Sequence, residues 1–287
     1  MVSSINTVGV VGAGIMGHGI AQVSAMAGYR VKLSDLSDDI LKRALKRIEG
    51  SLKKFSDKGK ISPEEEKAAL ARIETEADLS KMAEADFVIE AATENLQTKL
   101  DLFSRLDGIS GQEVILASNT SSLPITKLAA ATKRPEKVIG LHFMNPVPLM
   151  QLVEVVRGPL TSEETLSTSL ALVEKLGKTS VVVKDFPGFV SNRILMPLLN
   201  EAMYVLWEGT GEAEGIDTVA RLGLNHPMGP LALADLIGLD TCLSVMEVLY
   251  EGFLDPKYRP CPLLRQMVDA GLLGRKSGKG FYDYTGG

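Results

Sequence analysis

A glycine-rich turn between a strand-like and a helix-like segment constrains the fold of this chain more than any other feature. Residues Gly12–Gly17 read G-A-G-I-M-G and directly follow the β-branched stretch Thr7–Val11. In such a turn the first glycine permits the tight bend, the second lets the backbone approach a pyrophosphate, and the third lets helix and strand pack closely. The turn predicts a β-α-β unit that binds phosphate at its helix N-terminus. The expected ligand contacts are Gly12, Gly14, Ile15, Met16 and Gly17.

Asp35 indicates which ligand this turn binds. It follows the next strand-like segment, Arg30–Leu33, about 20 residues after the glycines, where dinucleotide-binding units carry a ribose-binding carboxylate. A carboxylate there accepts from both ribose hydroxyls and repels a 2′-phosphate, so we predict NAD rather than NADP. The alternative is a plain βαβ turn with a surface aspartate.

Short β-branched runs alternate with helical patterns through the first half of the chain. This alternation is typical of a parallel sheet covered by helices on both faces, so we predict a Rossmann-like, doubly wound, mostly parallel α/β sheet. The expected strands are Thr7–Val11, Arg30–Leu33, Phe87–Glu90, Val114–Ala117, Val138–Leu141 and Val181–Val183. A charged helical pair is expected within this region, at about residues 37–75. Its helices would be Ser37–Lys58 and Pro63–Glu74, the second with Ser62 as N-cap. The alternative is that this pair is only a charged surface hairpin.

The sequence becomes helical throughout after Lys184. Pro187 and Gly188 lead into expected helices at Val190–Trp207, Ile216–Arg221 and Leu231–Tyr250. At 287 residues the chain exceeds the size at which one core usually stops growing, so we predict two domains. These are an NAD-binding domain at 1–185 and an all-helical domain at 186–287. The apolar residues Ile194–Met196 and Leu198–Leu199 would form either a homodimer interface or the helical domain's own core.

Composition argues against several classes of protein. The net charge of −5, with lysine and arginine spread along the chain, disfavours nucleic-acid binding. The two cysteines, Cys242 and Cys261, form no C-x-x-C pair, so neither a disulfide framework nor a structural metal is expected. No run approaches the 18 or so apolar residues of a membrane span, and the first residues do not resemble a signal peptide. We therefore expect a cytoplasmic protein.

Polar residues follow the later strands of the predicted sheet. Glu94 comes after the third strand, Ser118–Ser122 after the fourth, and His142 ends the fifth, close to Asn145. Ligands of open α/β sheets lie at this carboxyl edge, so we expect these side chains near a nicotinamide. Glu94 is either a cofactor ligand or an acidic residue that starts a helix beside Asn95.

His142 is the candidate acid/base. Glu154 follows it after a stretch containing Pro146 and Pro148, which could turn the chain back on itself. Dehydrogenation of a secondary alcohol needs a base of near-neutral pKa, and a carboxylate behind a histidine orients the ring and stabilises its cation. The alternative is a purely structural histidine, which is also our interpretation of His18 and His226.

Several motifs, in the same order and from end to end of the chain, resemble the 3-hydroxyacyl-CoA dehydrogenase family. The resemblance implies NAD-linked interconversion of a short-chain (3S)-3-hydroxyacyl-CoA and its 3-oxoacyl-CoA, with the 3-hydroxybutyryl pair as the expected substrate. The implied arrangement places the acyl-CoA between a Rossmann-like domain and the helical domain, which we therefore expect to bind substrate. The motifs are Gly12–Gly17, Ala117–Leu123, Leu141–Pro148 with Leu152–Val155, Pro187–Arg193, His226–Pro230 and Gly278–Tyr282.

The same resemblance implies roles for individual residues. His142 matches the family's general acid/base and Glu154 its carboxylate partner. Ser121 and Asn192 match residues that bond the reacting oxygen or a neighbouring carbonyl, although alone they read as a strand-end cap and a first-turn helix residue. The implied NAD contacts also include Glu94, Lys99, Ser121 and Asn145. Lys54 and Lys58, four residues apart on one helix face, match positions at the CoA moiety, or are simply solvated lysines.

Three other functions share some of these sequence features. A related dehydrogenase of free hydroxy acids, such as a sugar acid, would not need Lys54 and Lys58. A noncatalytic NAD-binding protein would not need the intact set Ser121, His142, Glu154 and Asn192. The short-chain dehydrogenase class is disfavoured because no tyrosine is followed four residues later by lysine. Met144 and Gln151 depart from the family's usual aromatic and lysine, and we expect them to affect acyl preference.

Overall fold

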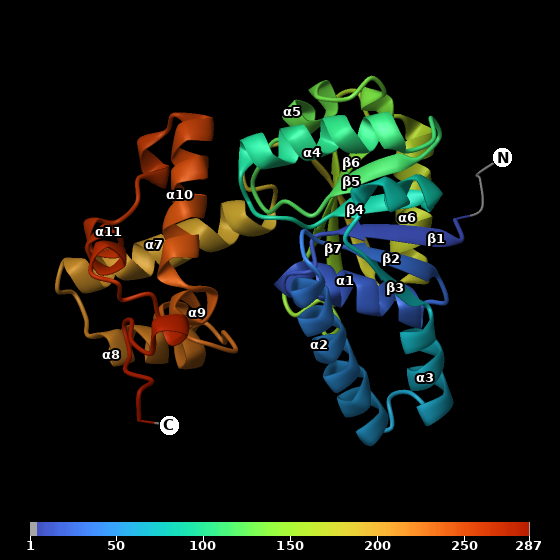
Figure 1. The fold of residues 1–287 in the computed structure, drawn as a ribbon. Helices are drawn as coiled ribbons and strands as arrows, with labels where there is room; N and C mark the ends of the chain where they lie inside the picture. Colours follow the sequence, from blue (N-terminus) through green and yellow to red (C-terminus); the bar gives the residue numbers. More distant parts are fainter. Residues whose placement is uncertain (1–4, 287) are drawn as a thin grey trace. The chain divides into compact units, whose positions relative to one another are not determined.

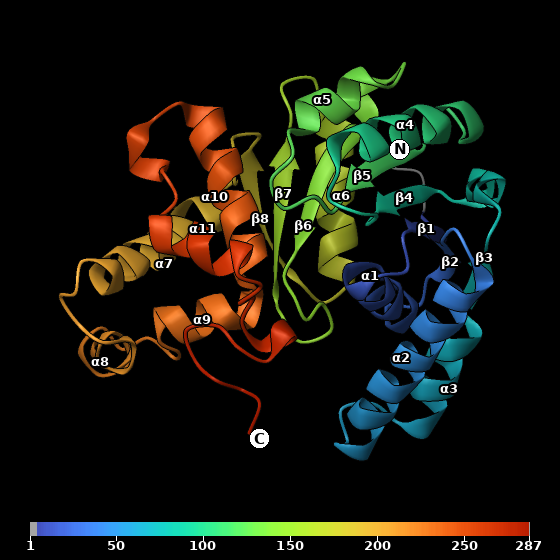
Figure 2. The ribbon, with the colours of Figure 1, turned by 60° about the vertical axis from the view of Figure 1, so that its left-hand side comes forward.

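The structure, a computed structural model, describes residues 5–286 and divides into two compact units, Met1–Asp185 and Phe186–Gly287. The first unit is an eight-stranded sheet with helices on both faces (Figure 1). The second is built from helices (Figure 2). The predicted fold class is therefore confirmed.

The sheet of the first unit has the strand order β3-β2-β1-β4-β5-β6-β7-β8. Neighbouring strands are parallel except β6 and β7, which are antiparallel. The chain proceeds from β1 to β2 on one side and then returns to β4 on the other, so the β1–β4 junction is a topological switch point where open sheets bind ligands. The strands are β1 (Thr7–Val11), β2 (Arg30–Ser34), β3 (Ile73–Glu76), β4 (Phe87–Glu90), β5 (Ile115–Ser118), β6 (Val138–Phe143), β7 (Leu152–Arg157) and β8 (Thr179–Lys184).

Helices α1 (Ile15–Met26) and α6 (Glu163–Lys175) cover one face of the sheet, and α4 (Leu96–Ile109) and α5 (Ile125–Ala130) cover the other (Figure 1). Apolar side chains of β1, α1 and α6 are buried together in one core cluster. Because successive strand residues point to opposite faces, strands covered on both sides must be apolar throughout. This explains why the short β-branched runs could be recognised in the sequence.

The predicted helical pair is present as α2 (Asp38–Asp57) and α3 (Pro63–Ala71), which run side by side in both views (Figures 1 and 2). Ser62 caps α3 as expected, and its hydroxyl and the Glu65 carboxylate form a reciprocal capping box. In α2 the buried side chains recur every three or four residues, so one face packs on the unit and the charged face remains exposed. The buried residues of α2 are Leu41, Ala44, Ile48 and Leu52.

Three expectations about elements were wrong or incomplete. Helix α3 ends at Ala71, not Glu74, because Ile73–Glu76 pairs with β2 as the edge strand β3. The strand Leu152–Arg157 was absent from the expected set, although it pairs with β6 along most of its length. The expected helix Leu231–Tyr250 is divided at Gly238, whose φ of 102° ends one helix before the next begins.

The second unit packs most of its helices around one apolar core. Met196 and Leu199 of α7 are buried in that core, whereas Ile194 and Leu198 on the same helix are 66% and 38% exposed. No helix in the described residues is both long and apolar enough to span a bilayer. The elements are α7 (Ser191–Trp207), α8 (Ala213–Thr218), a π turn (Val219–Gly223), α9 (Pro230–Ile237), α10 (Leu239–Phe253) and α11 (Pro262–Asp269).

Candidate active site

The glycine turn connects β1 to α1 at the switch point of the sheet. Gly12 has a φ of 100°, which only glycine adopts without strain, and its N–H donates to the Ser34 carbonyl at 2.8 Å. A Cβ on Gly17 would overlap the Gly12 carbonyl oxygen, whereas a Cβ on Gly14 would meet no atom within 4 Å. Packing within the protein therefore requires glycine at Gly12 and Gly17. The open space beside Gly14, at the start of α1, fits a pyrophosphate.

Asp35 follows β2 and bonds back to this turn. One carboxylate oxygen, Oδ2, accepts from the Ala13 N–H at 2.6 Å, and Oδ1 accepts from the Leu36 N–H at 2.7 Å. Each carboxylate oxygen has a further lone pair, so Asp35 can also accept from ribose hydroxyls. No side chain caps α1, so the first N–H groups of this helix suit a phosphate as their partner. These features together fit a dinucleotide.

The antiparallel pairing of β6 and β7 brings the predicted acid/base pair together. His142 lies opposite Glu154 in the strand register, and His142 Nδ1 is 2.8 Å from Glu154 Oε2. His142 is 8% exposed and Glu154 2% exposed. An ionised carboxylate only accepts, so Nδ1 carries the proton and Nε2 is the nitrogen that can take one. The chain reversal after His142 that the sequence suggested is thus present.

Glu94 organises the loop that carries Ser121. Its Oε1 accepts from Thr120 Oγ1 at 2.6 Å, from the Ser121 N–H at 2.9 Å and from Ser121 Oγ at 3.2 Å. The N-cap of α4 is instead Asn95, whose side chain accepts from the Thr98 N–H. Glu94 is therefore not the residue that caps this helix. Its carboxylate lies against residues 119–124, the loop between β5 and α5, which we call the serine loop.

The remaining predicted residues lie at three different places. Lys99 of α4 is buried, with its Nζ 2.6 Å from Glu90 Oε1. Asn145 is exposed and precedes a turn that Lys178 holds by donating to the Val147 and Met150 carbonyls, each at 2.7 Å. Burial lowers the pKa of Lys178 from its ordinary value. Asn192 lies in the first turn of α7, in the second unit.

Lys54 and Lys58 line a cavity of about 490 Å³ beside α2. The cavity also contains cationic side chains from Lys46, Arg47 and Lys60, and no Asp or Glu is among the described residues that line it. Lys54 and Lys58 are therefore part of a larger basic site, which suits a ligand with several phosphate oxygens.

Sequence reasoning missed Lys46, Arg47 and Lys60, and it treated His18 as structural although His18 also lines this cavity. A signal for Arg47 existed, because Arg47, Ser51, Lys54 and Lys58 recur every three or four residues and so share one helix face. Lys60 lies beyond the helix, and only the fold brings it to the cavity.

Comparisons with known proteins identify the family. Residues 7–186 match the family described as "3-hydroxyacyl-CoA dehydrogenase, NAD binding domain", and residues 188–284 match its C-terminal domain. A Bacillus subtilis protein called "Probable 3-hydroxybutyryl-CoA dehydrogenase" is 57% identical over 98% of both chains. A Bradyrhizobium diazoefficiens 3-hydroxybutyryl-CoA dehydrogenase is 53% identical over 100% of this chain and 98% of its own.

The solved structure of (S)-3-hydroxybutyryl-CoA dehydrogenase from Ralstonia eutropha superposes with a TM-score of 0.96 at 52% identity, covering 98% of this chain and 100% of that one. The first unit thus contains the family's NAD-binding fold and the second its C-terminal fold. With the glycine turn, Asp35 and the His142–Glu154 pair in place, this chain belongs to the 3-hydroxyacyl-CoA dehydrogenase family.

Proposed function

We propose that this chain interconverts (3S)-3-hydroxybutyryl-CoA and acetoacetyl-CoA with NAD as the redox partner. The observation that carries the proposal is the buried His142–Glu154 pair, 2.8 Å apart at the carboxyl edge of a dinucleotide-binding sheet. The similarity to proteins called 3-hydroxybutyryl-CoA dehydrogenase supports the choice of substrate. The charge at Asp35 supports NAD over NADP.

In the oxidative direction His142 Nε2 takes the proton of the 3-hydroxyl group as the hydrogen on C3 departs as hydride. NAD, when bound, supplies the hydride acceptor, and NADH supplies the donor in the reverse direction. Glu154 holds the ring through Nδ1 and stabilises the imidazolium that forms. Ser121 and Asn192 would donate to the reacting oxygen or the neighbouring carbonyl, where negative charge develops in the reductive direction. Glu94, Lys99 and Asn145 remain proposed cofactor contacts.

The basic cavity supports a CoA ester over a free hydroxy acid. CoA carries phosphate groups far from its reacting carbon, and the cavity beside α2 presents Lys46, Arg47, Lys54, Lys58 and Lys60. A small free acid has no group that would need these cations. We therefore propose that Lys54 and Lys58 contact the phosphates of CoA.

The test is NADH oxidation followed by absorbance with acetoacetyl-CoA, beside free acetoacetate and beside NADPH. We expect fast turnover only with the CoA ester and NADH. Activity on the free acid would favour the sugar-acid type of dehydrogenase, and absence of all activity would favour a noncatalytic NAD-binding protein.

Substitution within the basic cavity sharpens this test. Lys54→Gln with Lys58→Gln should raise KM for acetoacetyl-CoA about tenfold, with KM for NADH unchanged. The matched control is Lys53→Gln on the same helix, because Lys53 is 68% exposed and pairs with Asp57 instead of lining the cavity. Equal effects of the two changes would count against CoA at this place.

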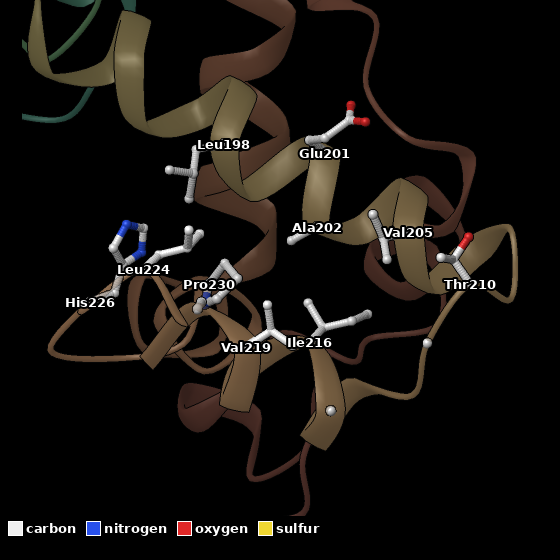
Figure 3. Close-up of a pocket in the computed structure, with 13 residues that line it drawn as sticks. Leu198, Glu201, Ala202, Val205, Thr210, Ile216, Val219, Leu224, His226 and Pro230 are labelled. Atoms are coloured by element: carbon white, nitrogen blue, oxygen red, sulfur yellow. The ribbon is translucent and has the colours of Figure 1, made fainter. Parts of the chain in front are cut away.

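We also propose that the second unit mediates a homodimer. It contains a cavity of about 600 Å³ between α7 and the π turn, into which mostly apolar side chains point (Figure 3). Val219 and Leu224 on its rim are 65% and 64% exposed. Exposed apolar patches of this kind mark association sites, and a second copy of this chain is the occupant we propose.

The free thiols of Cys242 and Cys261 support the proposed cytoplasmic location.

A further inference from the structure

A charged cluster lies beneath the serine loop, at the carboxyl ends of β4 and β5. Glu90, the last residue of β4, is fully buried. Its Oε1 accepts from Lys99 Nζ at 2.6 Å and from the Ala92 N–H at 2.7 Å, and its Oε2 accepts from Ser118 Oγ at 2.6 Å. Donors from β5, α4 and its own loop therefore hold the Glu90 carboxylate in place.

Lys99 connects this buried carboxylate to the exposed one of Glu94. The Lys99 side chain is 1% exposed, and its Nζ lies 3.5 Å from Glu94 Oε2. The other oxygen of Glu94 accepts from the backbone and side chain of Ser121. Polar contacts thus run continuously from Glu90 through Lys99 and Glu94 to Ser121.

Stability alone does not account for a lysine and a glutamate at this depth. Loss of hydration offsets much of the attraction in a buried ion pair, and a well-packed apolar pair of similar volume is often as stable or more so. Strand β4 is otherwise apolar, with Phe87, Val88 and Ile89 all fully buried. The charged residue of β4, Glu90, lies only at the end of the strand, next to the serine loop.

We propose that Glu90 is a positioning residue, which acts through Lys99 and Glu94 to hold the serine loop where Ser121 can bond the reacting oxygen. The inference rests on the proposed function, because it assigns Ser121 to that oxygen. Two carboxylates share one ammonium group here, so the cluster retains a negative charge, and Glu94 stays an acceptor for the loop. Removal of the Glu90 charge should shift the loop without removing any group that is proposed to contact substrate or cofactor.

The experiment compares Glu90→Gln with the double substitution Glu90→Leu and Lys99→Met. We expect Glu90→Gln to lower Tm and to lower kcat about 10- to 100-fold, with the Kd for NADH within about threefold of wild type. The double variant should recover part of the lost Tm, because no unpaired charge remains buried, while kcat measured at saturating NADH stays low. Recovery of kcat together with Tm would show that Glu90 contributes only to stability, and it would overturn the inference. In Glu90→Gln, a rise in the Kd for NADH by the factor lost from kcat would overturn it too.

Asp107→Asn is the matched control. Asp107 lies on the same helix as Lys99 and pairs with Arg134 at 3.0 Å, with their side chains 10% and 3% exposed. Breaking this pair should lower Tm and leave kcat unchanged. A fall in kcat equal to that of Glu90→Gln would show that any loss of a buried pair impairs turnover, against the proposal.

Hydrogen exchange gives a readout that does not depend on the substrate. The amides of Ser121, Ser122 and Leu123 are bonded to Glu94 or to Thr120 Oγ1, so their exchange should accelerate in both Glu90 variants and not in Asp107→Asn. If wild-type protein fails to turn over acetoacetyl-CoA while this pattern is seen, the proposed function fails and the positioning of the loop stands. Unchanged exchange in both Glu90 variants overturns the inference whatever the substrate.

Discussion

His142 on β6 lies opposite the buried carboxylate of Glu154 on the neighbouring strand β7. We predict that His142→Gln lowers kcat about 100- to 10,000-fold, because glutamine cannot exchange a proton near neutral pH. The Kd for NADH, measured by fluorescence titration, should stay near the wild-type value. Lys53→Gln, at an exposed residue of α2 paired with Asp57, is the control and should keep full turnover. Near-wild-type turnover in His142→Gln would contradict the acid/base assignment.

Two glycines of the same motif should respond differently to alanine. A Cβ on Gly17 would overlap the Gly12 carbonyl oxygen, so Gly17→Ala should lower both thermal stability and NADH affinity. Gly14 has a φ of −68° and open space where its Cβ would lie, so Gly14→Ala should keep Tm and raise the Kd for NADH about tenfold. Calorimetry and NADH titration on both variants check this. If Gly14→Ala bound NADH normally, the pyrophosphate would have to lie elsewhere.

At the scale of elements, the sequence predicted those that carry a strong local signal. The fully buried central strands read as β-branched runs, and Ser62 with Pro63 marked the start of α3. Strand β3 was missed because I-E-T-E is a half-exposed edge strand whose pairing with β2 depends on a segment distant in sequence. The division at Gly238 was missed because apolar spacing continues on both sides of the glycine.

In the candidate site, too, the sequence predicted the residues with a strong local signal and not those whose role depends on contacts between elements. Residues at strand ends, such as His142 and Ser121, could be found because parallel strands bring their carboxyl ends to one edge of a sheet. Glu90 was not singled out, since its importance depends on Lys99 reaching it from the next helix. Lys60 joins the basic cavity only when the turn after α2 has formed. Contacts between elements, and not composition or spacing, determine these roles.

The last segment of the second unit depends on one buried carboxylate of α9. Asp235 is fully buried and accepts from the Phe281 and Tyr282 N–H groups, each at 3.0 Å, and from the Tyr284 hydroxyl at 3.1 Å. We predict that Asp235→Ala lowers the free energy of unfolding by about 2–5 kcal/mol, because buried donors lose their acceptor. Urea denaturation checks this, with exposed Asp269→Ala as the control. A loss no larger than that of the control would show that the segment is held by its apolar contacts.

For the whole molecule, we expect the second unit to determine whether two copies of the chain form a dimer. Its four largest helices bury their own core, yet α7 and the π turn leave an apolar cavity with exposed Val219 and Leu224 on its rim. Met196 and Leu199, which the sequence offered as interface or core, belong to the core. The surface that we propose for a second copy is therefore narrower than the leucine- and methionine-rich sequence suggested, and it is the cavity of Figure 3 with its rim.

We predict that Leu224→Glu converts a dimer into a monomer, because a charge introduced at an apolar contact must be desolvated on association. Light scattering coupled to size exclusion measures the mass directly. Leu254→Glu is the matched control, since Leu254 is 84% exposed at the end of α10 and does not line the cavity. Its mass should remain that of the dimer. A dimer retained by Leu224→Glu would place the interface on another surface, and a monomeric wild-type protein would leave the cavity without the partner proposed for it.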